Sequence, residues 1–283
     1  MNGGGISVVL PTRDHKDLLR GCLEALKAQT LPPDEIVVVD NGSADGTGEM
    51  LARGFAGRVR CVREERRGVH HARNRGAAEA RGELLFFTDD DALPSPGWVR
   101  ALAACFEDAR VKCAGGPVEG IWPSGTPAPV RGSLRLRRCL GEIDWGGERR
   151  ALDPEGEFLT GANLACRRSA FGSGFQAVFP YGPLGVCGDD YELSRRLSRG
   201  GGGLYEPAAP VRHRIAAEKL RWTGLLARTA VFAAAGARLG HRLRPRRGPR
   251  ELLGAEGLVS AADALGHAAG RLWAAAAGGK ACL

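Results

Sequence analysis

The stretch Leu84-Leu85-Phe86-Phe87-Thr88-Asp89-Asp90-Asp91-Ala92-Leu93-Pro94 decides how the rest of the chain is interpreted. Its four apolar residues lead directly into three carboxylates and a turn with prolines at positions 94 and 96. An apolar run bounded by turn residues predicts a buried strand. Adjacent carboxylates repel one another unless a cation compensates them, and divalent metal ions prefer such oxygen ligands. A solvated acidic turn is the alternative, and this stretch by itself favours neither interpretation.

The composition is that of a globular protein with a sizeable core. The chain has 283 residues, 43% of them hydrophobic and 25% charged. Its net charge is +8, and five arginines gather within residues 242–250, which indicates a basic surface contact. The eight cysteines form no CxxC pair, so we expect free thiols in a reducing cytosol. No signal peptide or long apolar run is recognised, which predicts a cytoplasmic protein, peripheral at most at the inner face of the membrane.

Strand and helix patterns alternate through the first half of the chain. The predicted strands cover residues 6–10, 35–39, 59–63 and 83–87, and the predicted helices cover residues 17–29, 47–54, 69–80 and 98–109. This order predicts an α/β fold with a mostly parallel central sheet flanked by helices. Polar clusters at residues 11–14, 40–43 and 89–91 follow three of these strands. Ligands bind beyond the carboxyl ends of such strands, so the clusters favour a functional site over a solvated turn.

The second half of the chain is less regular. Residues 116–157 predict a strand followed by an irregular excursion, and residues 158–166 form an apolar segment with a polar centre. Residues 188–199 predict a helix that opens with two acids, whose alternative role is helix capping. A final strand is predicted at residues 204–213. Two helices at residues 217–240 and 251–277 would pack on the body, pair with another subunit in a homodimer, or contact a membrane surface.

Seven motifs in order resemble the inverting family 2 glycosyltransferases, which have the Rossmann-like GT-A fold. They lie at residues 6–14 (ISVVLPTRD), 22–26 (CLEAL), 35–47 (EIVVVDNGSADGT), 72–76 (ARNRG), 87–91 (FTDDD), 160–163 (TGAN) and 188–190 (GDD). The resemblance implies a GT-A domain over residues 1–215. Its nucleotide-binding half would span about 1–115 and its acceptor-binding half about 116–215, followed by a C-terminal helical extension at 216–283.

The resemblance assigns one group of residues to a nucleotide-sugar donor. Asp40 matches the family's acid that binds the base or ribose, and Arg73 matches an arginine near the diphosphate, where a planar fork suits anionic oxygens. A helix-surface arginine is the alternative for Arg73. Asp90 is included only for shaping its turn. The donor-side residues are Pro11, Thr12, Arg13, Asp40, Gly42, Ser43, Arg73, Asp89 and Asp90.

The resemblance also implies a metal site and a catalytic base. Asp91 and Asp89 match the acids of the family's D-x-D motif, and His213 matches a late histidine, so these three would hold Mn²⁺ or Mg²⁺. Asp190 matches the carboxylate that deprotonates the acceptor hydroxyl. Asp189 precedes it where the family usually has glutamate. The acceptor-side residues are Gly161, Asn163 and Asp189.

The function implied is metal-assisted transfer of a sugar, from a UDP-sugar by family habit, to a lipid-linked glycan, a polysaccharide end or a small molecule. One alternative is a nucleotidyltransferase, but residues 11–14 are not the glycine-rich basic phosphate loop that it would need. The other is a non-catalytic nucleotide- or polyanion-binding protein, which the basic charge favours weakly. We expect no nucleic-acid partner.

Overall fold

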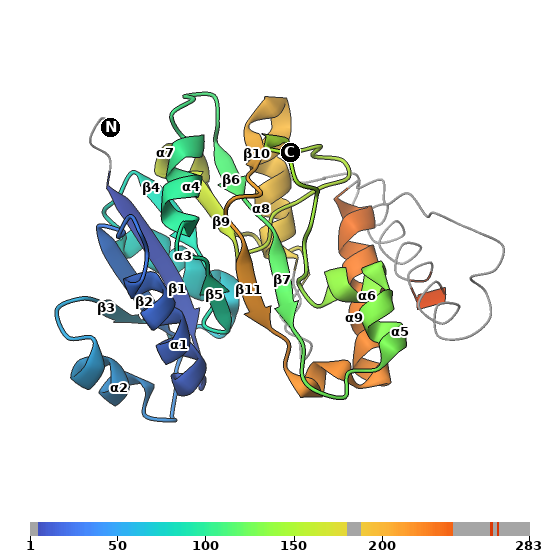
Figure 1. Ribbon diagram of the computed structural model, residues 1–283, viewed down its shortest axis with the longest axis horizontal. Helices are drawn as coiled ribbons and strands as arrows, with labels where there is room; N and C mark the ends of the chain where they lie inside the picture. Colours follow the sequence, from blue (N-terminus) through green and yellow to red (C-terminus); the bar gives the residue numbers. More distant parts are fainter. Residues whose placement is uncertain (1–4, 180–187, 240–260, 263–264, 266–283) are drawn as a thin grey trace.

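The computed structural model describes residues 5–179, 188–239, 261, 262 and 265 (Figure 1). The arginine run at 242–250 and most of the helix predicted at 251–277 lie outside these residues. The elements are β1 (Ile6–Thr12), α1 (Lys16–Lys27), β2 (Glu35–Asp40), α2 (Thr47–Gly54), β3 (Arg60–Arg63), α3 (Val69–Glu79), β4 (Leu84–Phe87), β5 (Ala92–Pro94), α4 (Trp98–Cys105), β6 (Cys113–Gly115), β7 (Val118–Ile121), α5 (Ala128–Gly132), α6 (Leu134–Cys139), β8 (Arg150–Ala151), β9 (Leu164–Arg167), α7 (Arg168–Phe171), α8 (Asp189–Ser198), η1 (Arg199–Gly201), β10 (Gly203–Tyr205), β11 (Val211–Arg214), η2 (Ala217–Leu220) and α9 (Trp222–Arg238).

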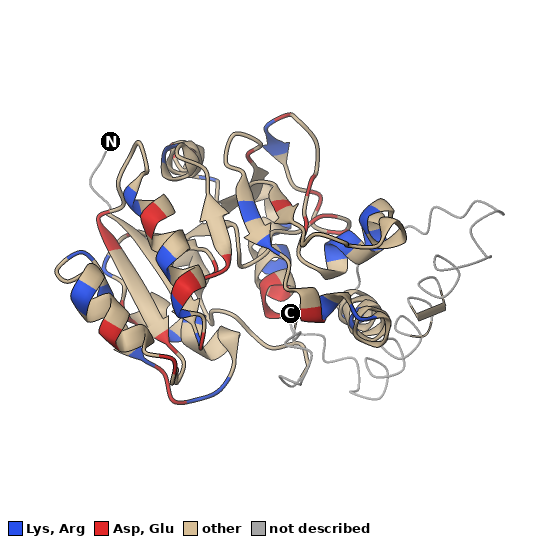
Figure 2. Cartoon of the chain, turned by 60° about the horizontal axis from the view of Figure 1, so that its bottom comes forward, with Lys and Arg blue, Asp and Glu red and all other residues tan. Residues whose placement is uncertain are grey.

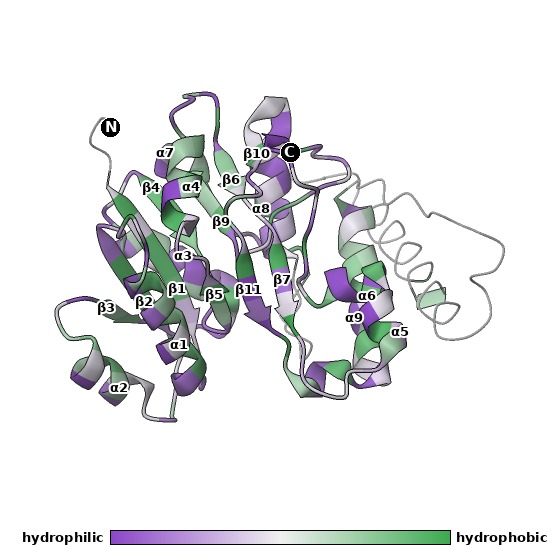
Figure 3. Ribbon diagram, viewed as in Figure 1, coloured by the Kyte–Doolittle hydropathy of each residue, from purple (hydrophilic) through white to green (hydrophobic). Residues whose placement is uncertain are grey.

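An eight-stranded sheet with the order β3-β2-β1-β4-β9-β6-β10-β8 forms the centre of the molecule. The strands β3, β2, β1 and β4 run parallel, and the antiparallel pairs all involve β9 or β8. The predicted α/β fold with a mostly parallel sheet is therefore confirmed. Figure 2 shows most charged residues on helices and loops, and Figure 3 shows hydrophobic stretches along the central strands.

Helices cover both faces of this sheet, which is why the strands are apolar at successive positions. Val8 and Leu10 pack on one face in a cluster with α1 and α4, where Leu19, Leu23 and Leu26 of α1 repeat at helical spacing. Val9 points to the opposite face and packs in a cluster with α3 and α8. The carboxyl ends of β1, β2 and β4 are held at one edge by this packing.

A second, three-stranded sheet with the order β5-β11-β7 closes that edge. The strand predicted at residues 204–213 is wrong as a single element, because β10 belongs to the large sheet and β11 to the small one. Pro207 and Pro210 separate them, and a proline has no N–H to continue a ladder. In the small sheet His213 lies opposite Ala92, directly after the three acids.

The strand predicted near the start of residues 116–157 is β7, and the excursion that follows it contains two short helices, α5 and α6, and the short strand β8. Ser133 begins α6 by accepting a hydrogen bond from the Leu136 amide. The helix α9 lies within the predicted helix 217–240 and packs against α6, with Leu225 buried between them and Ile215 (Figure 1). Packing on the body is thus the arrangement observed for α9. Within the described ranges, no helix combines the length and apolarity that crossing a bilayer requires.

Candidate active site

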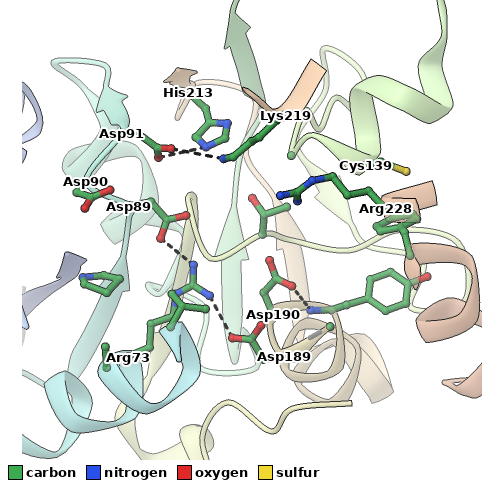
Figure 4. Close-up of a pocket in the computed structure, with 18 of the residues that line it drawn as sticks. Arg73, Asp89, Asp90, Asp91, Cys139, Asp189, Asp190, His213, Lys219 and Arg228 are labelled. Carbon is green, nitrogen blue, oxygen red and sulfur yellow. Dashed lines mark hydrogen bonds and ion pairs between the residues drawn. The ribbon is translucent and has the colours of Figure 1, made fainter. Parts of the chain in front are cut away.

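One cavity of about 500 Å³ gathers most of the predicted site residues. Loops after β1 and β4 form one side, and the N-terminus of α8, β11, η2 and α9 form the others (Figure 4). The three acids after β4 all line it, but their side chains have different partners. Each of the three therefore has its own role.

Asp90 fastens the acidic turn to the end of β1. Its Oδ2 accepts a hydrogen bond of 2.7 Å from Thr12 Oγ1, and His15 Nδ1 lies 3.2 Å from the same carboxylate. Burial raises the pKa of Asp90, and the hydrogen bond to Asp90 raises the pKa of His15. Asp90 and Thr12 hold the turn in place, and His15 is a cavity residue that the sequence motifs did not indicate.

Asp91 faces the histidine from the small sheet. Its Oδ1 lies 3.1 Å from His213 Nε2, and its Oδ2 lies 3.9 Å from the ammonium of Lys219. Burial alone would raise the pKa of Asp91, but the hydrogen bond and charge of His213 outweigh burial and lower it. The other ring nitrogen of His213 is buried and has no hydrogen-bond partner among the described residues. Asp91 and His213 are thus brought together as predicted.

Arg73 links the acidic turn after β4 to the first turn of α8. Its side chain is buried, and its guanidinium donates to Asp89 Oδ1 at 2.7 Å and to Asp189 Oδ2 at 3.1 Å. Burial disfavours the charged guanidinium, but Asp89 and Asp189 outweigh it and raise the pKa of Arg73. Both ends of the fork are therefore occupied by carboxylates, one from the donor-side turn and one from α8. The surface-arginine alternative is wrong.

Asp190 is a half-buried carboxylate at the start of α8. Its Oδ2 accepts the Gly161 amide at 3.1 Å and its Oδ1 accepts the Tyr191 amide at 2.9 Å. Burial, followed by the charge of Asp189, raises the pKa of Asp190 to about 6. A carboxyl group with a pKa in this range exchanges protons near neutral pH, which suits a general base.

Of the polar cluster after β2, residues 40–43, only Asn41 lines the cavity. Gly42 adopts a φ of +85°, a conformation that favours glycine, and the following Ser43 amide donates to Asp40 Oδ1 at 2.8 Å. Pro11 and Arg13 line the cavity, as does Asn41, which the motifs did not single out. The predicted donor-side residues Asp40, Gly42 and Ser43 do not line the cavity.

The two acceptor-side residues of the TGAN segment have unlike positions. Gly161 lies directly against the Arg73 guanidinium, because a Cβ at this position would be 2.2 Å from Arg73 Cζ. Asn163 is fully buried and hydrogen-bonds Trp98 Nε1 at 2.8 Å and the carbonyls of Pro117 and Ala209. The placement of Asn163 on the acceptor side is corrected, since its amide is used entirely to join segments of the core.

The wall opposite the donor-side acids comes from segments where the family likeness fades. Arg138 of α6 and Arg228 and Phe232 of α9 line it, together with Phe158 and Tyr191. Nothing in the irregular sequence of 116–157, or in the alanine-rich sequence of α9, indicated that α6 and α9 meet beside the cavity that Asp190 lines. Their approach is a product of tertiary packing.

At this edge Asp91 and His213 contact each other, and the Lys219 ammonium lies 3.9 Å from Asp91 Oδ2. Within the described ranges, no three His, Cys, Asp or Glu side chains gather closely enough to hold a metal ion unaided. A carboxylate oxygen and an imidazole nitrogen facing each other nevertheless fit Mn²⁺ or Mg²⁺, because such ions complete their shells with water and substrate phosphates. The six described cysteines are free thiols, and only Cys139 lines the cavity.

Comparisons with known proteins agree with this geometry. Residues 7–175 match the sequence profile of Glycosyl transferase family 2. Glycosyltransferase AglE of Haloferax volcanii is 26% identical over 200 residues, covering 64% of this chain and 66% of the relative. The pre-mycofactocin glycosyltransferase of Mycobacterium tuberculosis is 26% identical over 278 residues, covering 94% and 54%. The chain thus spans about half to two thirds of the length of these relatives.

Two solved structures show the same fold. Mannosyltransferase PcManGT from Pyrobaculum calidifontis, in complex with GDP-Man and Mn²⁺, superposes with a TM-score of 0.60 at 20% identity, covering 99% of this chain and 76% of that one. GalNAc-T7 with UDP, GalNAc and Mn²⁺ gives a TM-score of 0.58 at 19% identity, covering 93% and 55%. The profile match spans more than half of the chain, and the fold is the GT-A fold of these structures. The chain therefore belongs to glycosyl transferase family 2.

Proposed function

We propose that this chain transfers a sugar from a nucleotide-diphosphate sugar to an acceptor hydroxyl, with inversion at the sugar carbon and Asp190 as the general base. One observation carries the proposal. A single cavity holds the donor-side acids on one wall and the Asp190 carboxylate with a raised pKa on another, and Arg73 links Asp89 to Asp189 beside Asp190. Direct displacement by an acceptor needs this arrangement, because the base and the leaving group act on opposite faces of the sugar.

On the donor side, Asp91 and His213 would hold Mn²⁺ or Mg²⁺ between them. When bound, the ion neutralises negative charge that builds up on the departing nucleoside diphosphate. Asp89, which Arg73 holds, would face the ribose or a metal-bound water, and Pro11 and Arg13 line the same cavity. The set of donor atoms fits the ion, and few protein ligands are needed when phosphates supply the rest.

Lys219 adds a second cation at this edge. Its ammonium lies 3.9 Å from Asp91 Oδ2 and enters the cavity from η2 (Figure 4). A lysine in this position can move from the carboxylate to a diphosphate oxygen when the donor arrives. It would then stabilise the leaving group as a point charge.

Asp190 would take the proton of the attacking hydroxyl. Each of its oxygens accepts one backbone N–H, which fixes the carboxylate while leaving lone pairs for the acceptor. Its pKa of about 6 means that it is mostly ionised at pH 7 and remains a stronger base than an ordinary aspartate. No covalent intermediate is required, so the reaction proceeds with inversion.

We propose a UDP-sugar as the first donor to test, on the basis of the family resemblance. The solved neighbours bind GDP-Man in one case and UDP in another, so GDP-sugars are the second class. The polar contacts that would distinguish the bases lie around Asp40 and Asn41, at the end of β2.

The test combines binding and turnover. Calorimetry with Mn²⁺ should detect one nucleoside diphosphate that binds wild type, and Asp190→Asn should bind it equally well. Transfer or donor hydrolysis by Asp190→Asn should fall by about 10²- to 10⁴-fold, the typical contribution of a general base. Asp108→Asn is the control, because Asp108 is an exposed residue paired with Arg110 outside the cavity. Near-normal turnover by Asp190→Asn, or no binding of any nucleoside diphosphate, contradicts the proposal.

A further inference from the structure

The wall of the cavity that faces away from the donor-side acids is built from one face of α9. Arg228, Phe232 and Ala235 all line the cavity, and their spacing of four and three residues places them on one side of the helix. The helix is anchored through Leu225, which packs in a buried cluster with Leu136 of α6. This face is therefore held over the cavity by a packed interface.

Two arginines enter the cavity from this wall. Figure 4 shows Arg228 reaching from α9 into the space between Lys219 and Asp190. Arg138 comes from α6, and its guanidinium lies 4.5 Å from the centre of the Trp145 ring. Arg138 forms no ion pair with any residue that the structure describes, and burial lowers its pKa although the charge of Glu157 acts in the opposite direction. A half-buried guanidinium without an acidic partner is costly unless a ligand supplies the negative charge.

Aromatic rings form the floor between these arginines and the base. Tyr191 directly follows Asp190, and its ring packs edge-to-face on Phe158 with centroids 4.5 Å apart. Phe232 of α9 completes the group at 5.7 Å from Phe158 and 5.9 Å from Tyr191. A molecule that presents a hydroxyl to Asp190 must therefore lie against these rings and below the two arginines.

We propose that Arg138 and Arg228 bind a phosphate group of the acceptor, so that the acceptor substrate is a phosphate ester. This inference rests on the proposed function, because it assumes that the acceptor hydroxyl approaches Asp190. Two guanidiniums match a phosphate monoester, which carries nearly two negative charges at pH 7, better than they match a carboxylate. The donor diphosphate has its own cations on the other side of the cavity, at Lys219 and the Asp91–His213 pair.

The first experiment needs no knowledge of the natural acceptor. Wild-type protein saturated with the nucleoside diphosphate and Mn²⁺ is titrated with phenyl phosphate in a calorimeter, with benzyl alcohol as the uncharged comparison. We expect phenyl phosphate to bind and benzyl alcohol not to. Arg138→Gln and Arg228→Gln should each weaken the binding about tenfold or more, as loss of a charge-assisted pair does. Arg138→Lys and Arg228→Lys should retain part of it.

The controls separate this inference from the proposed function. Arg131→Gln, at an exposed position on α5, should bind the probe like wild type. Nucleoside diphosphate binding shows that each variant is folded, and its absence in wild type sinks the proposed function itself. Unchanged probe binding in both glutamine variants overturns only the acceptor inference. If these variants lose affinity for the nucleoside diphosphate but still bind the probe, the inference is also overturned, because the arginines would then bind the donor and not the acceptor.

The second experiment identifies the source of the phosphate. Transfer from the donor is measured to a water-soluble sugar monophosphate and to a sugar attached through a diphosphate to a short polyprenol in detergent, both of which offer a sugar hydroxyl to Asp190. Turnover of either acceptor that falls about tenfold in the glutamine variants supports the inference and shows whether the phosphate is free or lipid-linked. Equal turnover of both phosphorylated acceptors by wild type and the two glutamine variants contradicts it.

Discussion

Replacing Asp189 by asparagine should shift the pH profile of the enzyme to lower pH. Asp189 is buried, and its carboxylate lies next to Asp190 in the first turn of α8. Its negative charge is one of the causes that raise the pKa of Asp190 to about 6, second only to burial. Asparagine removes this charge and leaves Arg73, whose charge lowers the pKa of Asp190, with one carboxylate fewer to compensate it. Both effects have the same sign.

The magnitude follows from the position of the acid limb. A general base must be ionised, so the wild-type rate should be constant above pH 7 and fall tenfold per pH unit well below pH 6. Loss of a neighbouring like charge lowers a carboxyl pKa by about one unit. At pH 5 the ionised fraction then rises from roughly one tenth to one half, so the rate relative to the plateau should increase about fivefold.

The assay is release of nucleoside diphosphate from the donor, measured as kcat/KM from pH 4.5 to 8.5 at saturating Mn²⁺. Each variant is normalised to its own plateau, because Asp189→Asn also weakens the hold on Arg73 and lowers the absolute rate. Glu192→Gln is the matched control in the same turn of α8, since Glu192 pairs with Arg196 at 2.8 Å and is not among the charges that shift the pKa of Asp190. An acid limb of Asp189→Asn that overlays that of wild type, or moves to higher pH, refutes the reasoning.

Three further substitutions test other parts of the site. Asp91→Ala should abolish the Mn²⁺-dependent part of nucleoside diphosphate binding in calorimetry, and unchanged binding would remove Asp91 from the metal site. Gly161→Ala should lower turnover at least tenfold with donor binding measured in parallel, because its Cβ would lie 2.2 Å from Arg73 Cζ; wild-type kinetics would show that the arginine can move freely. Asn163→Leu should lower the free energy of unfolding in urea by about 2–4 kcal/mol, since Trp98 and two carbonyls lose their partner; full stability combined with a selective loss of acceptor affinity would restore an acceptor role.

The donor half of the fold could be predicted because its signals are local. The strands β1, β2 and β4 are short apolar runs, and the helix α1 that follows β1 has its apolar residues on one face. Parallel strands of this kind bring their carboxyl ends to one edge, so Thr12 and the three acids had to meet. The mutual positions of Asp91 and Asp190 followed from the family motifs.

The remaining features depend on long-range packing, which a local pattern does not contain. His213 reaches Asp91 only because β5, a three-residue strand, pairs with β11 in the register that places Ala92 opposite His213. Asn163 belongs to a motif associated with acceptors, yet its fully buried amide shows that it serves the core. The wall formed by α6 and α9 required two helices 90 residues apart in sequence to meet, as the contact of Cys139 with Thr229 shows.

The aspartate at position 189 can be explained by its ion pair with Arg73. Aspartate in place of the usual glutamate still reaches Arg73, because Gly161 has no side chain that would displace the guanidinium, which Asp89 holds from the other side. One guanidinium thus shares its charge between a donor-side carboxylate and the neighbour of the base. If the donor draws Asp89 away from Arg73, the arginine's charge acts more strongly on Asp189 and Asp190 and lowers the pKa of Asp190. The base would then be ionised most completely when a donor is present, which couples proton removal to an occupied donor site.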